Sequence, residues 1–340
     1  MMNLKDQPEY YQQTLSLIEK SFGYNEKYSF AIDFAPLLDQ SNWHHCFILL
    51  DEEKKNVIAH IALKERDLLL NNTSYKIGLI GGICVEKEFR GKGIFKSFIE
   101  KVMRLNELSY LAYLLWSDQA DLYSKFNFYQ VGGQIQLGQS SNYNLENLGF
   151  ERTDWIDISA SEFLEITNLY DQYISKMISI KRSLADWNLI KKIHSTKLYI
   201  KRSNNEIVSY LFLGKGQDLQ GIIHEFIYKE GDGKSLIAKL NEYKLWLPEG
   251  IAIEKTNSQS FYTTFLRISD PCLFKEFVNQ WSNGKVKIVS FEKDKLFFQF
   301  LDKEYNTNTE EFLKYLLGPS PLMEFKEFFK PFLISGLDSI

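Results

Sequence analysis

The most informative stretch of the sequence is residues 83–95, Ile-Cys-Val-Glu-Lys-Glu-Phe-Arg-Gly-Lys-Gly-Ile-Phe. An apolar strand ends at Val85, and a short turn that contains two glycines follows it. Apolar residues then recur from Ile94 to Met103 at the spacing of one helix face. The stretch therefore predicts a strand, a glycine turn and an amphipathic helix in direct succession. Many α/β proteins use such a turn only to pack a helix on a sheet, so the turn alone leaves its function open.

The composition of the turn favours a bound anion. The first N–H groups of a helix have no acceptor within the helix, and they lie at the positive end of its dipole. Gly91 and Gly93 let the backbone approach an anion without interference from a Cβ atom. Arg90 and Lys92 add positive charge beside it. A pyrophosphate fits this combination.

Two blocks of the sequence, in this order, resemble the GNAT (GCN5-related N-acetyltransferase) superfamily. Val85 and residues 90–93 follow that family's acyl-CoA signature, V-x-P-x-x-R-G-x-G-I/L-G/A. Residues 114–119 and 122–128 look like the family's next strand and its "FYxxxGF" helix. The resemblance implies a GNAT domain with bound acyl-CoA.

Three positions depart from the family pattern. Lys87 stands where the family usually has proline, Phe95 where it has a small residue, and Asn127 where it has glycine. Asparagine tolerates the left-handed backbone conformation, so the change at Asn127 is mild. A bulky ring at Phe95 lies near the pyrophosphate turn, and we expect it to pack inward as the first core residue of the helix. The same ring breaks the triple-glycine spacing of a Rossmann turn, which excludes that alternative.

Composition limits the class of protein. The chain has 340 residues, which suits two or three domains, and its 44% hydrophobic content predicts a well-buried core. A net charge of −4 gives no general attraction to nucleic acid or to anionic membranes. No apolar run approaches the roughly 18 residues that a membrane span needs. Three separated cysteines without metal-ligand spacing and a polar N-terminus predict a cytoplasmic protein without bound metal.

The order of the expected elements divides the chain into three units of an α/β (α+β) fold. The first unit, residues 1–145, has the helix–hairpin–strand order of a GNAT domain, whose mixed sheet is flanked by helices. The second unit, residues 146–256, begins with helical stretches at 160–192 and then repeats a hairpin, a strand, a glycine turn and a helix. Its turn has Asp232 and no preceding arginine, which favours a degenerate GNAT-like unit over an unrelated α/β domain. The third unit, residues 257–340, alternates short strands and helices.

Three units in this order resemble the enhanced intracellular survival family of acetyltransferases. In that family an active GNAT domain precedes an inactive GNAT-like domain and a sterol-carrier-like domain. The resemblance implies that the second unit shapes the acceptor side without binding CoA, and that the third unit is a small sterol-carrier-like domain.

The resemblance also implies acetyl-CoA as the acyl donor and assigns residues to it. The pantetheine arm pairs with the edge of the strand at Ile83, Cys84 and Val85, whose backbone also presents an N–H group to the oxyanion. The pyrophosphate lies on Arg90, Gly91, Lys92, Gly93, Ile94, Phe95 and Lys96. Asp118 and Gln119 contact the cofactor's far arm.

Tyr123 occupies the position of the family's tyrosine that protonates the departing thiolate. A phenol with a pKa near ~10 suits this task, because a CoA thiol is a comparably weak acid. The alternative is a tyrosine that only packs on its helix. Cys84 has no His–Asp partner in the sequence, which argues against an acyl-cysteine intermediate. His44 and His45 lack a third metal ligand and are expected to be structural.

The general base has two interpretations. The resembled family uses its own terminal carboxylate, which implies this role for Ile340 at the end of an apolar, glycine-containing tail. The alternative for the tail is docking for stability alone. Glu65 and Asp67, on a strand that faces the acceptor side, are alternative bases acting through water.

The sequence therefore predicts an acetyl-CoA-dependent N-acetyltransferase in which an amine attacks the thioester directly within a ternary complex. The expected acceptor is a small-molecule or peptide amine, and neither nucleic acid nor a membrane is expected as a partner. Association into homo-oligomers is left open. Two other functions compete with it. A Fem-type aminoacyl transferase shares a tandem GNAT layout but lacks the R-G-x-G turn, and an acyl-CoA-binding sensor shares the turn without turnover.

Overall fold

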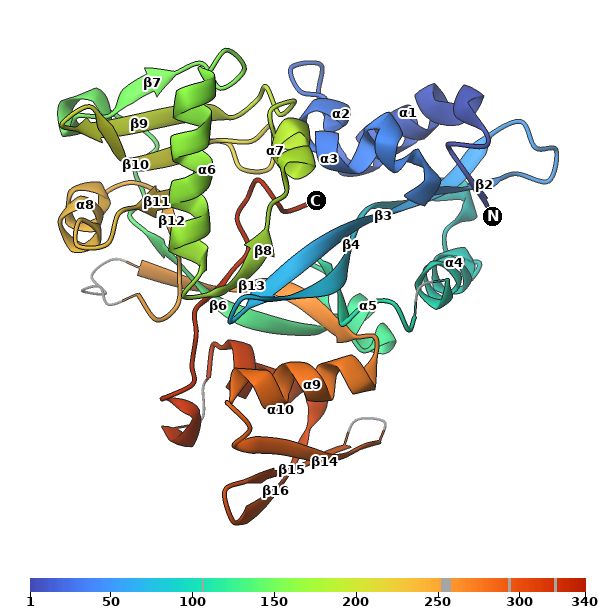
Figure 1. Ribbon diagram of the computed structural model, residues 1–340. Coiled ribbons are helices and arrows are strands. Elements are labelled where there is room, and N and C mark those ends of the chain that lie inside the picture. The colour runs from blue at the N-terminus through green and yellow to red at the C-terminus, as the bar shows by residue number, and fades with distance from the viewer. Residues whose placement is uncertain (106, 252–257, 293–294, 321–322) are drawn as a thin grey trace.

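In the computed structural model, a mixed sheet of fourteen strands, counted over the residues that the structure describes, runs through the first two units and includes two strands of the third (Figure 1). A separate three-stranded sheet lies in the third unit. The structure describes residues 1–105, 107–251, 258–292, 295–320 and 323–340. Among these residues, no helix is both long and apolar enough to cross a membrane.

The first unit contains two helical regions before its strands. Its helices and strands are β1 (Met2–Asn3), α1 (Tyr11–Phe22), α2 (Phe30–Asp33), α3 (Ala35–Leu38), β2 (Cys46–Leu50), β3 (Val57–Leu70), β4 (Thr73–Val85), α4 (Ile94–Arg104), β5 (Ala112–Leu115), α5 (Ala120–Tyr123) and β6 (Tyr129–Leu137). Short 3₁₀ helices lie at Pro8–Tyr10, Gln40–His45, Lys87–Phe89 and Ser124–Phe126. The helix, hairpin and strand order predicted from the sequence is therefore present.

In the second unit, one long helix lies across the strands of a hairpin (Figure 1). After a 3₁₀ helix at Glu146–Leu148, its elements are β7 (Glu151–Thr153), α6 (Ala160–Ile174), β8 (Ile178–Lys181), α7 (Leu184–Ile190), β9 (Lys197–Ser203), β10 (Glu206–Leu213), β11 (Ile223–Tyr228), α8 (Gly233–Leu240) and β12 (Leu245–Pro248). Helical stretches were expected at 160–192; α6 and α7 are present there, and β8, which was not predicted, lies between them. Ile178 and Ile180 are fully buried there, and β-branched side chains suit an extended segment that pairs with β3.

The third unit begins with a strand that belongs to the large sheet. Its elements are β13 (Ser258–Ile268), α9 (Pro271–Trp281), β14 (Val286–Glu292), β15 (Lys295–Phe300), β16 (Lys303–Asn308), α10 (Thr309–Leu317), a 3₁₀ helix at Met323–Phe325 and β17 (Phe332–Leu333). β13 pairs with β5 on one side and with β6 on the other. The predicted boundary between residues 256 and 257 lies outside the described residues. The division into three domains and the sterol-carrier likeness stay predictions.

The order of the strands shows how the units share one sheet. The main path is β1-β2-β3-β4-β5-β13-β6-β12-β11-β10-β9-β7, and β8 joins the sheet beside β3. β3 and β4 are antiparallel, and β4 and β5 are parallel with α4 between them. The second unit repeats this arrangement: β10 and β11 are antiparallel, and β11 and β12 are parallel with α8 between them.

Local capping explains where several helices begin. Asp270 accepts hydrogen bonds from the N–H groups of Cys272 at 2.7 Å and Leu273 at 3.2 Å, directly before Pro271 opens α9. Ser159 and Glu162 form a reciprocal capping box at the start of α6. These signals are local, so the sequence specifies them without help from the tertiary structure.

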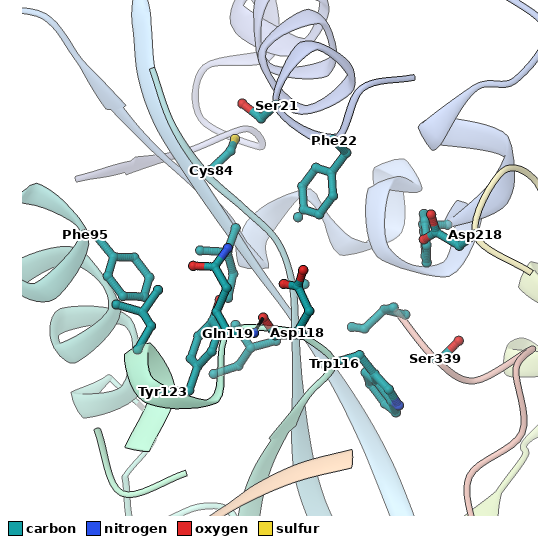
Figure 2. Close-up of a pocket in the computed structure, with 18 of the residues that line it drawn as sticks. Ser21, Phe22, Cys84, Phe95, Trp116, Asp118, Gln119, Tyr123, Asp218 and Ser339 are labelled. Atoms are coloured by element: carbon teal, nitrogen blue, oxygen red, sulfur yellow. Dashed lines mark hydrogen bonds between the residues drawn. The ribbon is translucent and has the colours of Figure 1, made fainter. Parts of the chain in front are cut away.

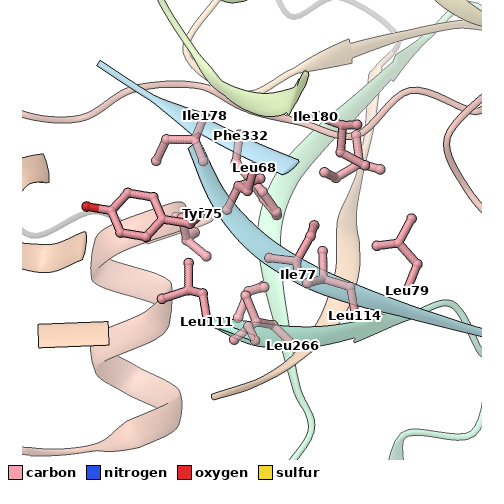
Figure 3. Close-up of a cluster of buried hydrophobic side chains, with 14 of the residues drawn as sticks. Leu68, Tyr75, Ile77, Leu79, Leu111, Leu114, Ile178, Ile180, Leu266 and Phe332 are labelled. Atoms are coloured by element: carbon pink, nitrogen blue, oxygen red, sulfur yellow. The ribbon is translucent and has the colours of Figure 1, made fainter. Parts of the chain in front are cut away.

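A core shared by all three units lies where β3, β4 and β5 meet β8, β13 and β17. This cluster brings together Leu68, Ile77, Leu114, Ile178, Ile180, Leu266 and Phe332 (Figure 3). Tyr75 packs edge-on against Phe277 of α9, with ring centroids 5.2 Å apart. Each fully buried aliphatic side chain contributes about 1.5–3 kcal/mol, so this core holds the units in a fixed arrangement.

Candidate active site

Strand β4 separates from its parallel neighbour halfway along its length. β4 and β5 pair at three positions, from Ile77 opposite Ala112 to Leu79 opposite Leu114. Beyond Leu79 no pair between these two strands occurs in the described part of the chain, whereas β3 continues to pair with β4 up to Val85. The edge of β4 after Leu79 is therefore free of β5, as the pantetheine-binding role predicted for Ile83, Cys84 and Val85 requires.

A bulge in β4 marks the point of separation. The register with β3 shifts between His60 and Ala62, and Gly82 has a φ of +59°. The Nδ1 atom of His60 lies 2.7 Å from the carbonyl oxygen of Gly82. Burial lowers the pKa of His60 to about 4, so the ring is neutral and Nδ1–H donates to this carbonyl. His60 therefore holds the bulge in place.

The glycine turn is open. Gly91 and Gly93 both have a φ of +76°, and a Cβ atom built on either would meet no atom within 4 Å. The N–H groups of Gly91, Lys92 and Gly93 have no acceptor among the described residues, and no side chain caps α4. The Nε atom of Arg90 donates to the carbonyl of Val85 at 2.8 Å, which ties the turn to the end of β4. The turn therefore offers unpaired donors to an anion.

A cavity of about 1050 Å³ joins this turn to the free edge of β4. It is lined by the predicted site residues Ile83, Cys84, Val85, Arg90, Gly91, Gly93, Ile94, Phe95, Lys96, Asp118, Gln119, Tyr123 and Ile340. Lys92 is the predicted site residue that does not line it, and its Nζ atom lies over the ring of Phe89, 4.9 Å from the centroid. The structure thus brings the two sequence blocks and the chain terminus together, and their roles in binding and catalysis stay predictions.

Phe95 does not cover the turn. Its ring packs edge-on against Tyr123, with centroids 6.0 Å apart, and against Phe126 at 5.3 Å (Figure 2). Space above Gly91 and Gly93 remains open. The bulky residue is accommodated as expected, at the side of the cavity.

Tyr123 lies at the end of α5 with only 7% of its surface exposed. Burial, followed by the negative charge of Asp118, raises the pKa of its phenol to about 12. The phenol is therefore protonated throughout the neutral range, and it can act as a proton donor at the cavity wall.

The chain terminus reaches the same strand. A Cβ atom built on Gly81 of β4 would lie 2.9 Å from the carbonyl carbon of Ile340, and Ile340 is 8% exposed. The alternative bases lie elsewhere: Glu65 and Asp67 do not line the cavity, and Lys76 contacts them at 2.5 Å and 3.7 Å. Of these three candidate bases, Ile340 lines the cavity and Glu65 and Asp67 do not, and the identity of the base stays a prediction.

Several residues that the sequence did not single out complete the cavity. Phe22 and Trp116 point into one space, with Asp118 between them and with Asp218 and Ser339 on the facing side (Figure 2). Further residues of the same wall are Phe30, Phe34, Lys215, Trp246, Phe261 and Tyr262. They come from all three units, and no local motif marks them, so only the tertiary structure identifies them.

Other reactive side chains do not support different chemistry. Burial raises the pKa of the Cys84 thiol to about 12, so it stays protonated and is a poor nucleophile. The rings of His44 and His45 lie 4.1 Å apart, and no group of three metal-ligating side chains occurs in the part of the chain that the structure describes.

The first unit thus combines a separated strand, an open glycine turn at a helix start and a tyrosine in the next helical segment, which are the features that the resemblance to acyl-CoA-binding domains led us to expect. Residues 5–131 match the family model described as an acetyltransferase (GNAT) domain. The chain therefore carries a GNAT domain in this segment. No curated protein matches the chain.

Solved structures extend the likeness to the whole chain. A GCN5-related N-acetyltransferase from Anabaena variabilis has a TM-score of 0.61 at 12% identity, over 96% of this chain and 92% of that one. A probable N-acyltransferase from Enterococcus faecalis has a TM-score of 0.57 at 15% identity, with coverages of 90% and 84%. Eis1 from Mycobacterium abscessus has a TM-score of 0.57 at 11% identity, with coverages of 94% and 90%. At these identities the likeness shows the fold alone, and that fold includes all three units.

Proposed function

We propose that the protein is an acetyl-CoA-dependent N-acyltransferase that moves an acetyl group to a primary amine in a ternary complex. One observation carries the proposal: the open turn, the free edge of β4, a protonated Tyr123 and the chain terminus all line one cavity. Each of these features serves a different requirement of acyl transfer.

The donor binds along the path from the turn to the bulge. The unpaired N–H groups of Gly91 and Gly93 hold the pyrophosphate, and the edge of β4 around Ile83 pairs with the pantetheine amides. The bound thioester supplies the electrophilic acyl carbon. Fixing it beside the amine removes up to about 7–11 kcal/mol of the entropic barrier in favourable cases.

The reaction balances with two groups of the protein. The amine nitrogen forms a bond to the acyl carbon, and the bond between that carbon and the sulfur breaks. The carboxylate of Ile340 accepts the proton that the amine loses, and the phenol of Tyr123 donates a proton to the departing thiolate.

The donor-binding part of the proposal is tested by calorimetry with acetyl-CoA, followed by a thiol-release assay over a panel of small amines and peptide N-termini. We expect binding and thiol release that depends on an amine. Binding without release would support the acyl-CoA-binding sensor, and absence of binding would contradict both.

The role of Tyr123 is tested by Tyr123→Phe. We expect turnover to fall about 100-fold or more, because a positioned general acid contributes 10²–10⁴-fold, with acetyl-CoA affinity unchanged. Tyr113→Phe is the matched control: burial also raises the pKa of Tyr113 to about 12, and its hydroxyl donates to the carbonyl of Met103 outside the cavity. Equal turnover in the two variants would remove Tyr123 from the mechanism.

The role of Ile340 is tested by adding one glycine after it. One residue moves the carboxylate by up to about 3.5 Å and leaves every other side chain in place. We expect turnover to fall about 100-fold with donor binding retained, and deletion of the last four residues should do likewise. Unchanged turnover in both would exclude the terminal carboxylate as the base.

A further inference from the structure

The last ten residues of the chain, 331–340, run along the second unit before they enter the cavity (Figure 1). β17 pairs in parallel with β8, with Phe332 opposite Ile178 and Leu333 opposite Ser179. The hydroxyl of Ser179 donates to the carbonyl of Leu333 at 2.8 Å. The tail is therefore bound to the second unit from its first residues onward.

A buried ion cluster then fixes the tail. The guanidinium of Arg182 donates to Glu225 of β11 at 2.5 and 3.1 Å, and to Asp338 of the tail at 2.7 to 3.2 Å. All three side chains are at most 1% exposed. The guanidinium also lies over the rings of Tyr170 at 4.1 Å and Trp187 at 4.5 Å. Two aromatic rings and two carboxylates thus contact the guanidinium of Arg182. These contacts fix the position of Asp338.

Two more contacts hold the backbone on either side of Asp338. The hydroxyl of Ser335 donates to Glu225. The Nζ atom of Lys215, which is 2% exposed, donates to the carbonyl of Gly336 at 2.8 Å and to the carbonyl of Ser339 at 2.5 Å. Ser339 is the neighbour of Ile340. Lys215 therefore acts one residue away from the terminal carboxylate.

Close packing leaves no room for the tail to shift. A Cβ atom on Gly336 would lie 2.6 Å from the ring of His224. Leu337 is fully buried in the core of the second unit, beside Trp155 and Trp187. The tail therefore anchors in the core of one unit and ends on a strand of another.

We propose that Arg182, Glu225, Asp338 and Lys215 are positioning residues, which hold the tail so that the carboxylate of Ile340 lies at Gly81 of β4. The proposal rests on the proposed function, in which that carboxylate is the general base. Buried ion clusters are costly compared with apolar packing, because each charge loses its hydration, and in some proteins they specify one geometry rather than add stability. The second unit thereby contributes to catalysis in the first without touching the donor turn.

The experiment combines Asp338→Asn in the full-length chain with three measurements. Carboxypeptidase digestion followed by mass spectrometry reports directly whether the terminus leaves the cavity. Calorimetry with acetyl-CoA reports donor binding, and steady-state kinetics separate kcat from KM. We expect the variant to lose its C-terminal residues to the protease while wild type resists. We also expect kcat to fall about 100-fold, because displacement of a reacting group by about 1 Å costs that much, with KM for acetyl-CoA unchanged.

A matched control guards against a general loss of stability. The Nη1 atom of Arg66, another buried arginine, contacts Asp186 at 2.6 Å, and neither residue lines the cavity. Asp186→Asn therefore removes the charge of a carboxylate from a buried ion pair outside the cavity. We expect this variant to resist carboxypeptidase and to keep its kcat. Equal release of the tail in both variants would overturn the proposal.

A second pair of variants keeps the test valid if Asp338→Asn does not fold. Lys215→Met removes the donors to Gly336 and Ser339. Its control, Lys201→Met, removes a lysine that donates to the carbonyl of Leu148 beside the ring of Phe150, far along the sheet from the tail. We expect tail release and a lower kcat only for Lys215→Met. A terminus that stays protected in Lys215→Met and Asp338→Asn would overturn the proposal.

The two proposals fail in different ways. A released tail with unchanged kcat would support the anchoring by these residues and would contradict only the terminal carboxylate as the base. A protected tail with unchanged kcat in Asp338→Asn would contradict the anchoring, and the one-glycine extension would still test the base separately.

Discussion

The turn before α4 and the turn before α8 join the same elements but have different surroundings. In the first turn, a Cβ atom built on Gly91 or Gly93 would meet no atom within 4 Å. In the second, Asp232 precedes α8, and a Cβ atom on Gly233 would lie 2.3 Å from the ring of Tyr228. In the second turn, therefore, the ring of Tyr228 fills the space at Gly233. Asp232 also gives this turn a negative charge at the position where the first turn has Lys92.

The strands behind the two turns are alike. β4 pairs with β5 at three positions, up to Leu79, and β11 pairs with β12 at one position, Ile223 opposite Leu245. A strand edge free of its parallel neighbour, a glycine turn and a helix are therefore present in both units. The two turns differ in the open space at Gly93 and in the sign of the charge at Lys92 and Asp232, so we expect these two features to decide whether a turn binds an anion.

The largest expected effect comes from filling the open turn with Gly93→Val. The new side chain occupies the space of the pyrophosphate and displaces two or more charge-assisted hydrogen bonds. Each such bond contributes about 1.5–3 kcal/mol, so coenzyme A affinity should fall about 1,000-fold by calorimetry.

Gly231→Val in the second turn is the control for this prediction. Gly231 has a φ of +99° with open space around it, so valine there meets the same backbone strain as at Gly93. We expect a comparable loss of stability and no change in coenzyme A affinity. Similar affinity losses in both variants would show that the first turn is not the phosphate site.

The two units also each bury a neutral histidine, and acid should destabilise both. Burial lowers the pKa values of His60 and His224 from 6.5 to about 4. Between pH 6.5 and 4 the unfolded chain binds protons that the folded chain rejects, so stability falls as the pH falls. Each histidine should cost about 2 kcal/mol by pH 5 and about 3 kcal/mol below pH 4.

Denaturant unfolding at pH 7 and pH 5 checks this prediction. His60→Gln keeps an amide donor for the carbonyl of Gly82 but cannot take up a proton. We expect it to lose about 2 kcal/mol less than wild type between the two pH values, and His224→Gln to do the same. A pH dependence equal to that of wild type would mean that folding does not lower the pKa of the replaced histidine.

Local patterns predicted most elements and the donor side of the site. The strand to Val85, the turn and the helix from Ile94 follow from side-chain periodicity and glycine placement, and α9 follows from its proline and cap. The insertion of β13 between β5 and β6 could not be predicted, because it pairs residues 121 to 156 positions apart in the sequence and depends on which sheet edges are free.

The wall of the cavity formed by Phe22, Asp218 and Trp246 could not be predicted for the same reason. Phe22 belongs to the first unit and the other two residues to the second, and they line one cavity only in the folded chain. Ile340 was placed by resemblance to a family, and Arg182, which anchors the tail, has no sequence neighbour that marks its role. Lys92 was assigned to the site from its charge and from the family resemblance, and the position of its Nζ atom over the ring of Phe89 depends on tertiary packing.

A smaller effect is expected from exchanging the charge of the two turns. Lys92→Asp gives the first turn the Gly-Asp-Gly sequence of the second. The side chain of Lys92 is exposed, so water screens its charge. The reversal should cost about 1–2 kcal/mol, which is roughly a fivefold to thirtyfold loss of coenzyme A affinity that weakens at high salt.

Asp232→Lys makes the reverse exchange in the second unit. We expect no binding of coenzyme A to this unit, because the ring of Tyr228 still covers Gly233. A gain of a second binding site in titrations of Asp232→Lys would show that charge, and not access to the backbone, distinguishes the two turns.

The smallest effect is expected at Asn127, which replaces the glycine of the family pattern. Asn127 ends the helical segment after Tyr123 with a φ of +60°, and Asn205 in the second unit has a φ of +65° in the hairpin between β9 and β10. Glycine adopts this conformation without strain but loses more entropy on folding, so the two terms nearly cancel. Asn127→Gly and Asn205→Gly should each change the free energy of unfolding by less than about 1 kcal/mol, with turnover unchanged. A loss of turnover confined to Asn127→Gly, at equal stability, would mean that the asparagine side chain helps to place Tyr123 and is more than a tolerated substitute for glycine.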